Sequence, residues 1–327
     1  MHKIALLGGT GFIGKHLIAR LAQKKWEILA FTRRREAHRE LLVLPTLKMV
    51  SINPYDQSQL NAQLAGCDVV VNLVGILNET GFDGDGFRKA HFELPQKVVT
   101  ACKANNIKRL LHVSALHADA KQGTSHYLRT KGEAEDFVHA QPDIQVTSFR
   151  PSVIFGEDDS FFNQFALMLK ISPVVAMVPC PQAKFAPVWV NDVVSAMLQS
   201  IDNPEHYGQR YNLCGPAVYT HEALWKYTAE LLGMKRRFML LSDKHSQNLA
   251  KVMESWIGQI ASFVLGLNGK PFSTDNYQSL QKDSVCQENH FQAFGITPRS
   301  IETELPRYLA TSTPRAAYTQ FRHQARR

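Results

Sequence analysis

The sequence predicts an α/β fold in which a doubly wound parallel sheet is followed by a smaller, mostly C-terminal α+β part. Two observations predict the sheet: a glycine-rich turn lies between an apolar run and a helical pattern near the N-terminus, and short apolar runs alternate with helical patterns up to residue 150. A third observation predicts the second part, because the alternation ends there in a proline-rich region. Alternating strands and helices favour a parallel sheet with right-handed crossovers.

Short apolar runs define the expected strands. The first run leads directly into the glycines, and the fourth is rich in valine, as expected of a strand buried on both faces. The expected strands are residues 3–7, 27–32, 47–52, 68–74, 109–114 and 145–150. Helical spacing of apolar residues predicts helices after the glycines and at residues 58–64, 87–105 and 127–140.

After Arg150 the alternation stops and prolines punctuate the chain. The expected elements here are a helix at 191–200, a strand at 210–213 and helices at 221–232 and 243–265. The last helix carries an apolar stripe that either packs on its own domain or faces a partner or membrane surface. We therefore predict one domain over 1–150, which can recruit strands from 185–215, and a smaller substrate or partner domain over 151–327 with a basic tail.

Composition narrows the classes of function. Apolar residues make up 44% and charged residues 20%, as in folded globular proteins, and the net charge of +8 favours an anionic ligand. Nucleic-acid binding favours basic residues interleaved with aromatic residues on one face, and the only basic clusters are residues 33–39 and 315–327, so nucleic-acid binding is not expected. The five cysteines form no CxxC pair, so we expect no disulfide framework and a cytoplasmic protein. No apolar stretch approaches the length of a transmembrane helix, which leaves attachment at the membrane periphery open.

The glycine turn at residues 8–14 satisfies both GxGxxG and GxxGxxG, between an expected strand and an expected helix. Glycines let the backbone turn tightly and approach a pyrophosphate, whose charge meets the positive end of the helix. We therefore expect a dinucleotide in a Rossmann-type first domain. A purely structural turn is the alternative.

The end of the second expected strand indicates which dinucleotide. NAD-binding proteins usually carry an acidic residue here, about 20 residues beyond the glycines, to accept the ribose hydroxyls. This chain has Thr32 followed by Arg33, Arg34 and Arg35, and its first carboxylate is Glu36. An arginine can pair with a 2′-phosphate, so Arg33 predicts NADP(H) in preference to NAD(H). The alternative is a solvated run of surface arginines.

Tyr127 and Lys131 are four residues apart and therefore share one face of the helix expected after the fifth strand. A nearby ammonium group lowers the pKa of a phenol from about 10, which suits the phenol for proton transfer near neutral pH. The YxxxK spacing alone is weak evidence, and its place at the start of this helix strengthens it.

Taken in order, these motifs resemble the short-chain dehydrogenase/reductase superfamily, in its extended or atypical branch. The further matching segments are NLVG at 72–75, HVSAL at 112–116, RPSVIFG at 150–156 and KFAPVWVNDV at 184–193. They resemble one subgroup most closely, which contains the nucleotide-binding accessory subunit of respiratory complex I and bacterial relatives, often named NAD-dependent epimerase/dehydratases. The resemblance extends from about residue 3 to residue 309.

The resemblance implies a cofactor site at the ends of the strands. Its residues would be Gly8, Gly11 and Gly14 at the pyrophosphate with Thr10, Phe12 and Ile13; Arg33 and Asn53 at the adenosine; Val74 and Gly75 at the ribose; Ser114, Tyr127 and Lys131 around the nicotinamide; and Pro151 and Val153 beneath the carboxamide. Tyr127 would exchange the proton, Lys131 would support it and anchor the ribose, and Ser114 would be an auxiliary donor. No metal site is expected, because the histidines lack ligand spacing, and the acidic turn at 157–159 is expected to cap a helix.

Two departures from the family pattern leave the activity open. Ala115 follows Ser114 where active relatives commonly carry Ser or Thr, and the stretch from Ser114 to Tyr127 is shorter than in sugar-nucleotide epimerases. One hypothesis is an NADP(H)-dependent oxidoreductase or epimerase. Its substrate would be a hydrophobic carbonyl or quinone-like compound near Phe161, Phe162 and Phe165, residues that core packing also explains. The other is a non-catalytic subunit or assembly protein of a respiratory or membrane-associated complex. A redox-sensing or RNA-associated relative ranks third.

Overall fold

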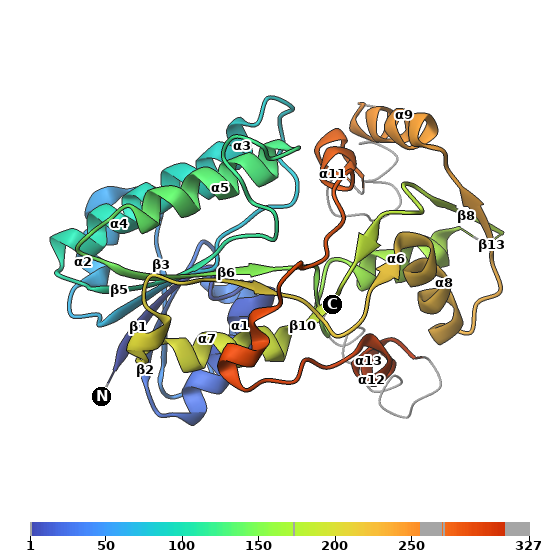
Figure 1. Ribbon diagram of the computed structural model, residues 1–327. Coiled ribbons are helices and arrows are strands. Elements are labelled where there is room, and N and C mark those ends of the chain that lie inside the picture. Colours follow the sequence, from blue (N-terminus) through green and yellow to red (C-terminus); the bar gives the residue numbers. More distant parts are fainter. Residues whose placement is uncertain (1, 173, 256–269, 271, 311–327) are drawn as a thin grey trace. The chain divides into compact units, whose positions relative to one another are not determined.

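The computed structural model in Figure 1 describes residues 2–172, 174–255, 270 and 272–310. The chain divides into two compact units. The first unit comprises Met1–Pro151, Val190–Leu213 and Glu288–Ile296, and the second comprises Ser152–Trp189, Cys214–Gln287 and Thr297–Arg327. The part of the expected 243–265 helix beyond residue 255, with most of its apolar stripe, and the basic tail from residue 315 lie outside the described residues.

The first unit is built on a seven-stranded sheet with the order β11-β6-β5-β4-β1-β2-β3. Its strands are β1 (Lys3–Leu7), β2 (Glu27–Thr32), β3 (Leu47–Ser51), β4 (Val69–Asn72), β5 (Arg109–Val113), β6 (Gln145–Pro151) and β11 (Arg210–Leu213). Every pairing in this sheet is parallel. The predicted doubly wound parallel sheet is confirmed, and the strand expected at 210–213 forms its edge.

The strand order reverses at the centre of the sheet. From β1 the chain moves outward through β2 and β3, and then returns to β4 on the other side of β1 and continues outward through β5 and β6. The connections that follow β1 and β4 therefore leave the sheet in opposite directions, which opens a crevice at the carboxyl ends of these strands. This crevice is where open α/β sheets bind their ligands.

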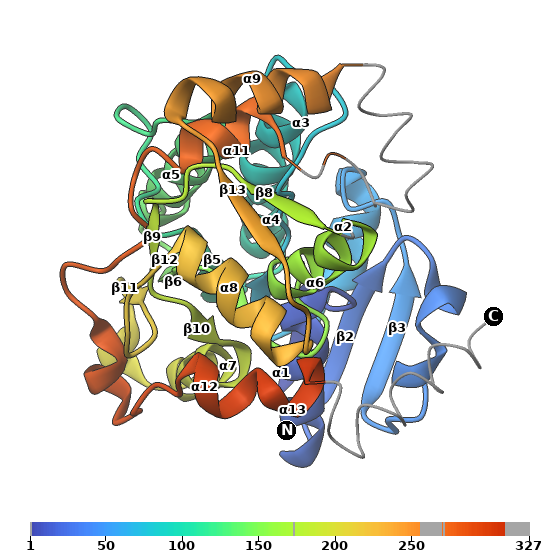
Figure 2. The ribbon, with the colours of Figure 1, turned by 90° about the vertical axis from the view of Figure 1, so that its right-hand side faces the viewer.

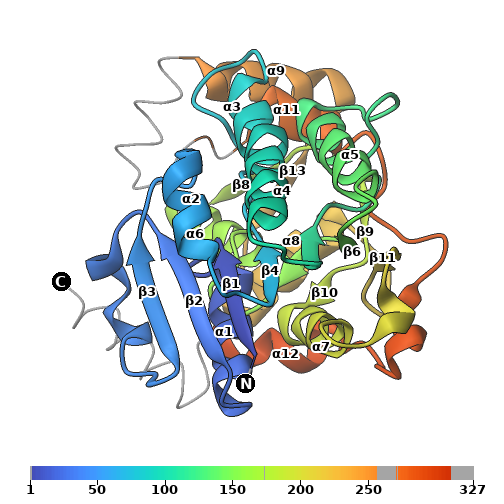
Figure 3. The ribbon, with the colours of Figure 1, turned by 90° about the vertical axis from the view of Figure 1, so that its left-hand side faces the viewer.

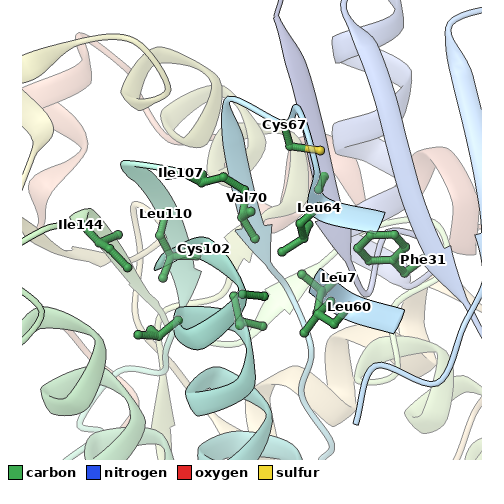
Figure 4. Close-up of a cluster of buried hydrophobic side chains, with 14 of the residues drawn as sticks. Leu7, Phe31, Leu60, Leu64, Cys67, Val70, Cys102, Ile107, Leu110 and Ile144 are labelled. Carbon is green, nitrogen blue, oxygen red and sulfur yellow. The ribbon is translucent and has the colours of Figure 1, made fainter. Parts of the chain in front are cut away.

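Helices cover both faces of this sheet, as Figures 1 and 3 show. One face carries α1 (Phe12–Gln23) and α7 (Val190–Ser200), and the other carries α2 (Gln57–Leu64), α4 (Leu94–Ala104) and α5 (His126–His139). Beneath the second group lies a buried cluster, in which Leu60 and Leu64 of α2 and Cys102 of α4 approach strand residues such as Val70 and Leu110 (Figure 4). Burial of this apolar surface holds the helical layer on the sheet.

The long helix predicted at 87–105 is interrupted by a wider turn. The structure has a short helix α3 (Asp85–Arg88), a π-helical turn η2 (Lys89–Glu93) and then α4. Pro95 lies in the first turn of α4 and has no N–H with which to continue an α-helical ladder. The backbone angles of the junction residues stay helical, so the segment is a continuous rod that contains a π-bulge.

The second unit contains helices and three two-stranded sheets, which pair β7 with β10, β9 with β12, and β8 with β13. The strands are β7 (Ile154–Phe155), β8 (Val175–Val178), β9 (Lys184–Phe185), β10 (Val188–Trp189), β12 (Tyr219–Thr220) and β13 (Arg237–Leu240). The helices are α6 (Phe162–Ile171), α8 (His221–Leu231), α9 (Asp243–Glu254), α11 (Thr274–Ser279), α12 (Ile301–Glu304) and α13 (Pro306–Leu309). Sequence analysis allowed strands within 185–215 but named none of these six, because runs of two to four residues carry little periodic signal.

The aromatic residues considered for a substrate site form the core of the second unit. Phe162 and Phe165 are buried, and the ring of Phe165 stacks on that of Trp225 with centroids 4.6 Å apart. Phe161 packs against the same cluster. The acidic turn caps α6 as predicted, because Asp159 accepts hydrogen bonds from the N–H groups of Phe161 and Asn163.

One disulfide, between Cys214 and Cys286, corrects the expectation drawn from the cysteine count. The two residues are 72 positions apart in the sequence, and their Cα atoms are 6.0 Å apart in the structure. The spacing of cysteines could not reveal that the chain returns to this point. Cys67, Cys102 and Cys180 are free. In the described part of the chain, no helix is long and apolar enough to cross a membrane, and no cluster of potential ligands could hold a metal ion.

The packing of α5 predicts an unusual response to a glycine substitution. A Cβ atom at Gly132 would lie 2.4 Å from the backbone nitrogen of Ala120 and from the carbonyl carbon of Asp119. Alanine is favoured over glycine within a helix by about 1 kcal/mol. Overlap with fixed backbone atoms outweighs this gain, so Gly132→Ala is expected to lower the free energy of unfolding by about 1–3 kcal/mol, measured by urea denaturation.

The exposed α2 position Ala62 supplies the control, because Ala62→Gly changes helix propensity without creating a contact. We expect this variant to lose about 0.5–1 kcal/mol. A Gly132→Ala protein that gains as much stability as Ala62→Gly loses would contradict the close approach of α5 to residues 119–120.

Candidate functional site

The glycine turn forms a cradle between β1 and β4. Gly8 has a φ of +77°, which favours glycine, and its carbonyl accepts a hydrogen bond of 3.0 Å from the N–H of Gly11. A Cβ atom on Gly8 would lie 3.1 Å from the carbonyl carbon of Leu73, and one on Gly14 would lie 2.4 Å from the carbonyl oxygen of Gly9. The lack of side chains therefore lets α1 and the segment after β4 close around the turn, which is the arrangement a pyrophosphate requires.

The start of α1 is open to an anion. Gly11 is the N-cap and makes no side-chain cap hydrogen bond, and the first turn contains no acidic residue. Phe12 and Ile13 begin this helix, with Thr10 just before the cap. The N–H groups of the first turn and the positive end of the helix dipole therefore remain available to phosphate oxygens.

Arg33 and Asn53 lie just beyond β2 and β3 at the same edge of the sheet. The register pairs Leu7 of β1 with Phe31 of β2, so Arg33 follows β2 at about the level at which the glycine turn follows β1. Arg33 is exposed and makes no ion pair with any described residue. Asn53 accepts a hydrogen bond of 3.1 Å from the N–H of Tyr55 and is held in a turn.

Tyr127 and Lys131 belong to the first two turns of α5, whose start is fixed by Ser125, which accepts a hydrogen bond from the N–H of Leu128. Lys131 is buried, and its Nζ donates a hydrogen bond of 2.9 Å to the carbonyl oxygen of Val113 at the end of β5. Burial lowers the pKa of Lys131 to about 8. A Cβ atom on Gly75 would lie 3.2 Å from this Nζ, so the structure brings Gly75 and Lys131 together.

His91, in the π-helical turn, joins this group, and sequence analysis missed it. Its Nε2 accepts a hydrogen bond of 3.0 Å from the N–H of Ile76, so the proton lies on Nδ1, which is 3.1 Å from Thr130 Oγ1. Burial, with a smaller contribution from the charge of Lys131, lowers the pKa of His91 to about 2. The ring of Tyr127 packs edge-on against it at 5.3 Å. A neutral histidine therefore ties the segment after β4 to α5.

Ser114 lies at the end of β5, but its hydroxyl group points into a buried ionic cluster. Its Oγ donates a hydrogen bond of 2.6 Å to Oε2 of Glu135, a buried residue of α5. Oε1 of the same carboxylate pairs with Nε of Arg150 at 2.9 Å and with Nε of Arg210 at 3.0 Å. The proton that Ser114 was expected to offer a substrate is therefore already shared with Glu135. No sequence pattern indicated this cluster.

The remaining predicted residues divide between the two units. Val74 donates its N–H to the side chain of Asn72 at 3.2 Å, and Pro151 accepts a hydrogen bond of 3.1 Å from the N–H of Leu116, so both lie at the carboxyl edge of the sheet. Val153 belongs to the second unit and packs against that unit's own core. The first unit thus gathers the predicted cofactor residues at one edge of the sheet, with the exception of Val153.

This edge of the sheet has three features of a dinucleotide-binding site. They are the glycine turn, the uncapped start of α1, and the ammonium group of Lys131, which reaches from α5 to the end of β5. Residues 4–214 match the sequence profile of the NAD dependent epimerase/dehydratase family. The chain belongs to this family. Its first unit is accordingly a Rossmann fold of the NAD(P)-binding type.

Two curated proteins are similar to this chain in sequence, and one solved structure is similar to it in fold. The chain is 26% identical to NADH dehydrogenase [ubiquinone] 1 alpha subcomplex subunit 9 of Arabidopsis thaliana, covering 91% of this chain and 74% of that protein. It is 24% identical to a ceramide reductase of Caulobacter vibrioides, covering 77% and 78%. The NADPH-dependent quinone oxidoreductase of Escherichia coli superposes with a TM-score of 0.70 at 17% identity, covering 92% and 97%.

The buried histidines of this family member predict a loss of stability in acid. Burial lowers the pKa of His112 to about 3, so His112, like His91, stays neutral in the folded protein. The unfolded chain binds these protons below about pH 6.5, so the free energy of unfolding falls by about 1.4 kcal/mol per pH unit per histidine as the pH decreases. In His91→Gln, the loss between about pH 6.5 and about pH 5 should be smaller by about 2 kcal/mol.

Urea denaturation across this pH range measures the difference. The exposed His245 supplies the control, because His245→Gln leaves both buried histidines in place. If His91→Gln and His245→Gln lose stability in parallel with the parent protein, His91 does not carry the proposed linkage.

Proposed function

We propose that the protein binds NADP(H) at the carboxyl edge of the seven-stranded sheet and reduces a hydrophobic carbonyl or quinone-like substrate. The observation that carries this proposal is the arrangement on α5, where buried Lys131 is fixed to the end of β5 one turn after Tyr127. In this proposal the first 150 residues, with the strand β11 recruited from 210–213, form the dinucleotide-binding domain, and the second unit supplies a surface for a substrate or partner.

The cofactor would be held by groups from successive strand ends. Gly8, Gly11 and Gly14, with the backbone of residues 10–13, would hold the pyrophosphate, because no side chain obstructs it and no side chain caps α1. Arg33 and Asn53 would receive the adenosine end. Val74, Gly75 and Lys131 would hold the nicotinamide ribose, with Pro151 at the carboxamide. The preference for NADP(H) depends on Arg33, whose exposed guanidinium group is free to pair with a 2′-phosphate.

When bound, the nicotinamide supplies a hydride to the substrate carbon. Tyr127 would donate its hydroxyl proton to the substrate oxygen, so that a carbonyl becomes an alcohol, and would regain a proton from solvent. The positive charge of Lys131 stabilises the phenolate that remains. Its lowered pKa, about 8, means that this charge is present near neutral pH and is lost as the pH rises above that value.

Two observations bear on the substrate. Ser114 shares its proton with Glu135, so Tyr127 is left as the main proton donor at this end of the site. The similarity to a ceramide reductase extends over 77% of the chain, which supports an apolar substrate with a reducible carbonyl group. The Ser114 hydroxyl would then have a structural role, because its hydrogen bond to Glu135 holds the end of β5 against α5.

The hydrogen bond of Ser114 to Glu135 also favours a second function, that of a nucleotide-binding protein without catalytic activity. A chain that binds NADP(H) without turnover needs no second hydroxyl beside the nicotinamide, and here Ser114 is paired with Glu135 and followed by Ala115. The similarity over 91% of the chain to a subunit of NADH dehydrogenase supports a nucleotide-stabilised member of a respiratory or membrane-associated complex. In that role the bound nucleotide stabilises the folded state by about 4 kcal/mol at a thousandfold excess over its Kd.

Cofactor preference tests the assignment of Arg33. We expect Arg33→Asp to weaken the binding of NADPH about tenfold to hundredfold, because a charge-assisted contact is lost, and to leave NADH binding nearly unchanged. Arg39→Asp makes the same change in charge at a residue that pairs with exposed Glu36, and should alter neither affinity. Isothermal titration calorimetry with NADPH and with NADH gives the ratio of the two dissociation constants for each variant. Equal loss for NADPH and NADH in Arg33→Asp would remove the argument for NADP(H).

Turnover separates the two functions. The purified protein is denatured to identify any released nucleotide, and NADPH oxidation is then followed with a panel of quinones and long-chain ketones. We expect Tyr127→Phe to slow an observed turnover at least about hundredfold, and Tyr227→Phe, which deletes a hydroxyl in the second unit, to leave it unchanged. Stoichiometric NADP(H) that no compound in the panel oxidises would instead favour the structural role.

A further inference from the structure

The small sheet of β8 and β13 in the second unit has an apolar face exposed to solvent. The two strands are parallel and pair Val175 with Arg237 and Met177 with Met239, so these four side chains share one face. Figure 2 shows both strands toward the viewer between α8 and α9. Met177 is 48% exposed and Met239 is 52% exposed, whereas Ala176 between the exposed positions is buried.

This pattern is the reverse of the usual one. A sheet with one face on a core normally carries polar residues on its other face. Here only Arg237 is polar among the four outward residues. Val174, which directly precedes β8, is also apolar and is 61% exposed. A contiguous group of exposed apolar side chains marks an interaction surface more often than chance exposure does. We call Val174, Val175, Met177 and Met239 the strand patch.

Cations surround one end of the strand patch. A hollow of about 540 Å³ begins at Val174 and Phe238 and is lined by four basic side chains and one acidic side chain. The charged lining residues are Lys226, Lys235, Arg236, Arg237 and Glu230. The charge of Lys226 is balanced by Glu222, whereas Arg236 keeps its charge and is held in place by a hydrogen bond to the carbonyl oxygen of Leu169. Lys235 and Arg237 are exposed and make no ion pair with a described residue.

We propose that the strand patch and the adjoining basic hollow dock on the surface of an anionic phospholipid bilayer. Apolar side chains of this kind enter the boundary between headgroups and acyl chains, while lysine and arginine at their edge meet the lipid phosphates. A free anion would use the basic hollow and leave the strand patch unexplained. A bilayer uses both, because it offers negative charge and apolar surface side by side.

The proposal does not depend on the nucleotide chemistry. The residues that carry it belong to the second unit, whereas the glycine turn, Tyr127 and Lys131 belong to the first. Loss of vesicle binding and loss of turnover are therefore separate results, and either function can fail alone.

Vesicle sedimentation of the full chain tests the proposal. One set of vesicles contains phosphatidylcholine alone, and the other has part of it replaced by phosphatidylglycerol. We expect binding to the anionic vesicles to be at least about tenfold tighter, since several cations near the surface each contribute to the attraction. Added salt should weaken this difference, because it screens the charges.

Two variants separate the basic and apolar contributions. Lys235→Glu with Arg237→Glu should reduce binding to anionic vesicles at least about tenfold. Met177→Ser with Met239→Ser should reduce it by about the same factor through lost apolar burial, with the salt dependence retained. Lys48→Glu with Lys108→Glu is the matched control, because it makes the same change in net charge at exposed positions of the first unit and should bind like the parent protein.

Three results would overturn the proposal. The first is no preference of the full chain for anionic vesicles. The second is a preference that the Lys235/Arg237 and Met177/Met239 variants leave unchanged, or that the Lys48/Lys108 control loses equally. The third is a dimer in analytical ultracentrifugation that Met177→Ser with Met239→Ser converts to monomer while no vesicle binding occurs, which would assign the strand patch to a second copy of the chain.

Discussion

The geometry of the site depends on the burial of one ammonium group, that of Lys131. Its Nζ donates a hydrogen bond to the carbonyl oxygen of Val113 at the end of β5, and it lies beside Gly75 in the segment that follows β4. Burying a charged group costs free energy, which is visible in its pKa of about 8. That cost is offset by the hydrogen bond and by the attraction of Glu135, one turn further along α5. A Cβ atom at position 75 would lie 3.2 Å from this ammonium group, so a larger residue there would require the lysine side chain to shift by a few tenths of an ångström.

The same helix carries a second buried charge that holds the sheet together. Glu135 pairs with Arg150 of β6 and Arg210 of β11, and it also accepts a hydrogen bond from the hydroxyl group of Ser114. A buried carboxylate with all of these donors is well satisfied, whereas removing one donor would leave an incompletely paired charge. The cluster explains how β11, which follows a long excursion of the chain into the second unit, is secured at the sheet edge. Helix α5 therefore places Lys131 at the candidate site and also holds the strands β6 and β11 through Glu135.

Local patterns predicted the strands of the sheet and most of the cofactor residues, and contacts between distant residues account for what was missed. The runs at 3–7 and 27–32 match β1 and β2 because buried parallel strands are continuous apolar segments. His91 could not be predicted, since its role depends on Ile76 and Thr130, 15 and 39 positions away. Glu135 looks like an ordinary helix residue in the sequence. The 87–105 helix was predicted without its π-bulge because the helical period is nearly the same on both sides.

The disulfide has a consequence for the covalent structure of the chain. Cys214 and Cys286 close a ring that includes β12, α8, β13, α9 and α11. A protease that cuts once between them would leave two pieces still joined through sulfur, and they would separate only after reduction and unfolding. The strand β13, which bears part of the strand patch, lies inside this ring. In an oxidising environment a single cut therefore cannot release it from the rest of the protein.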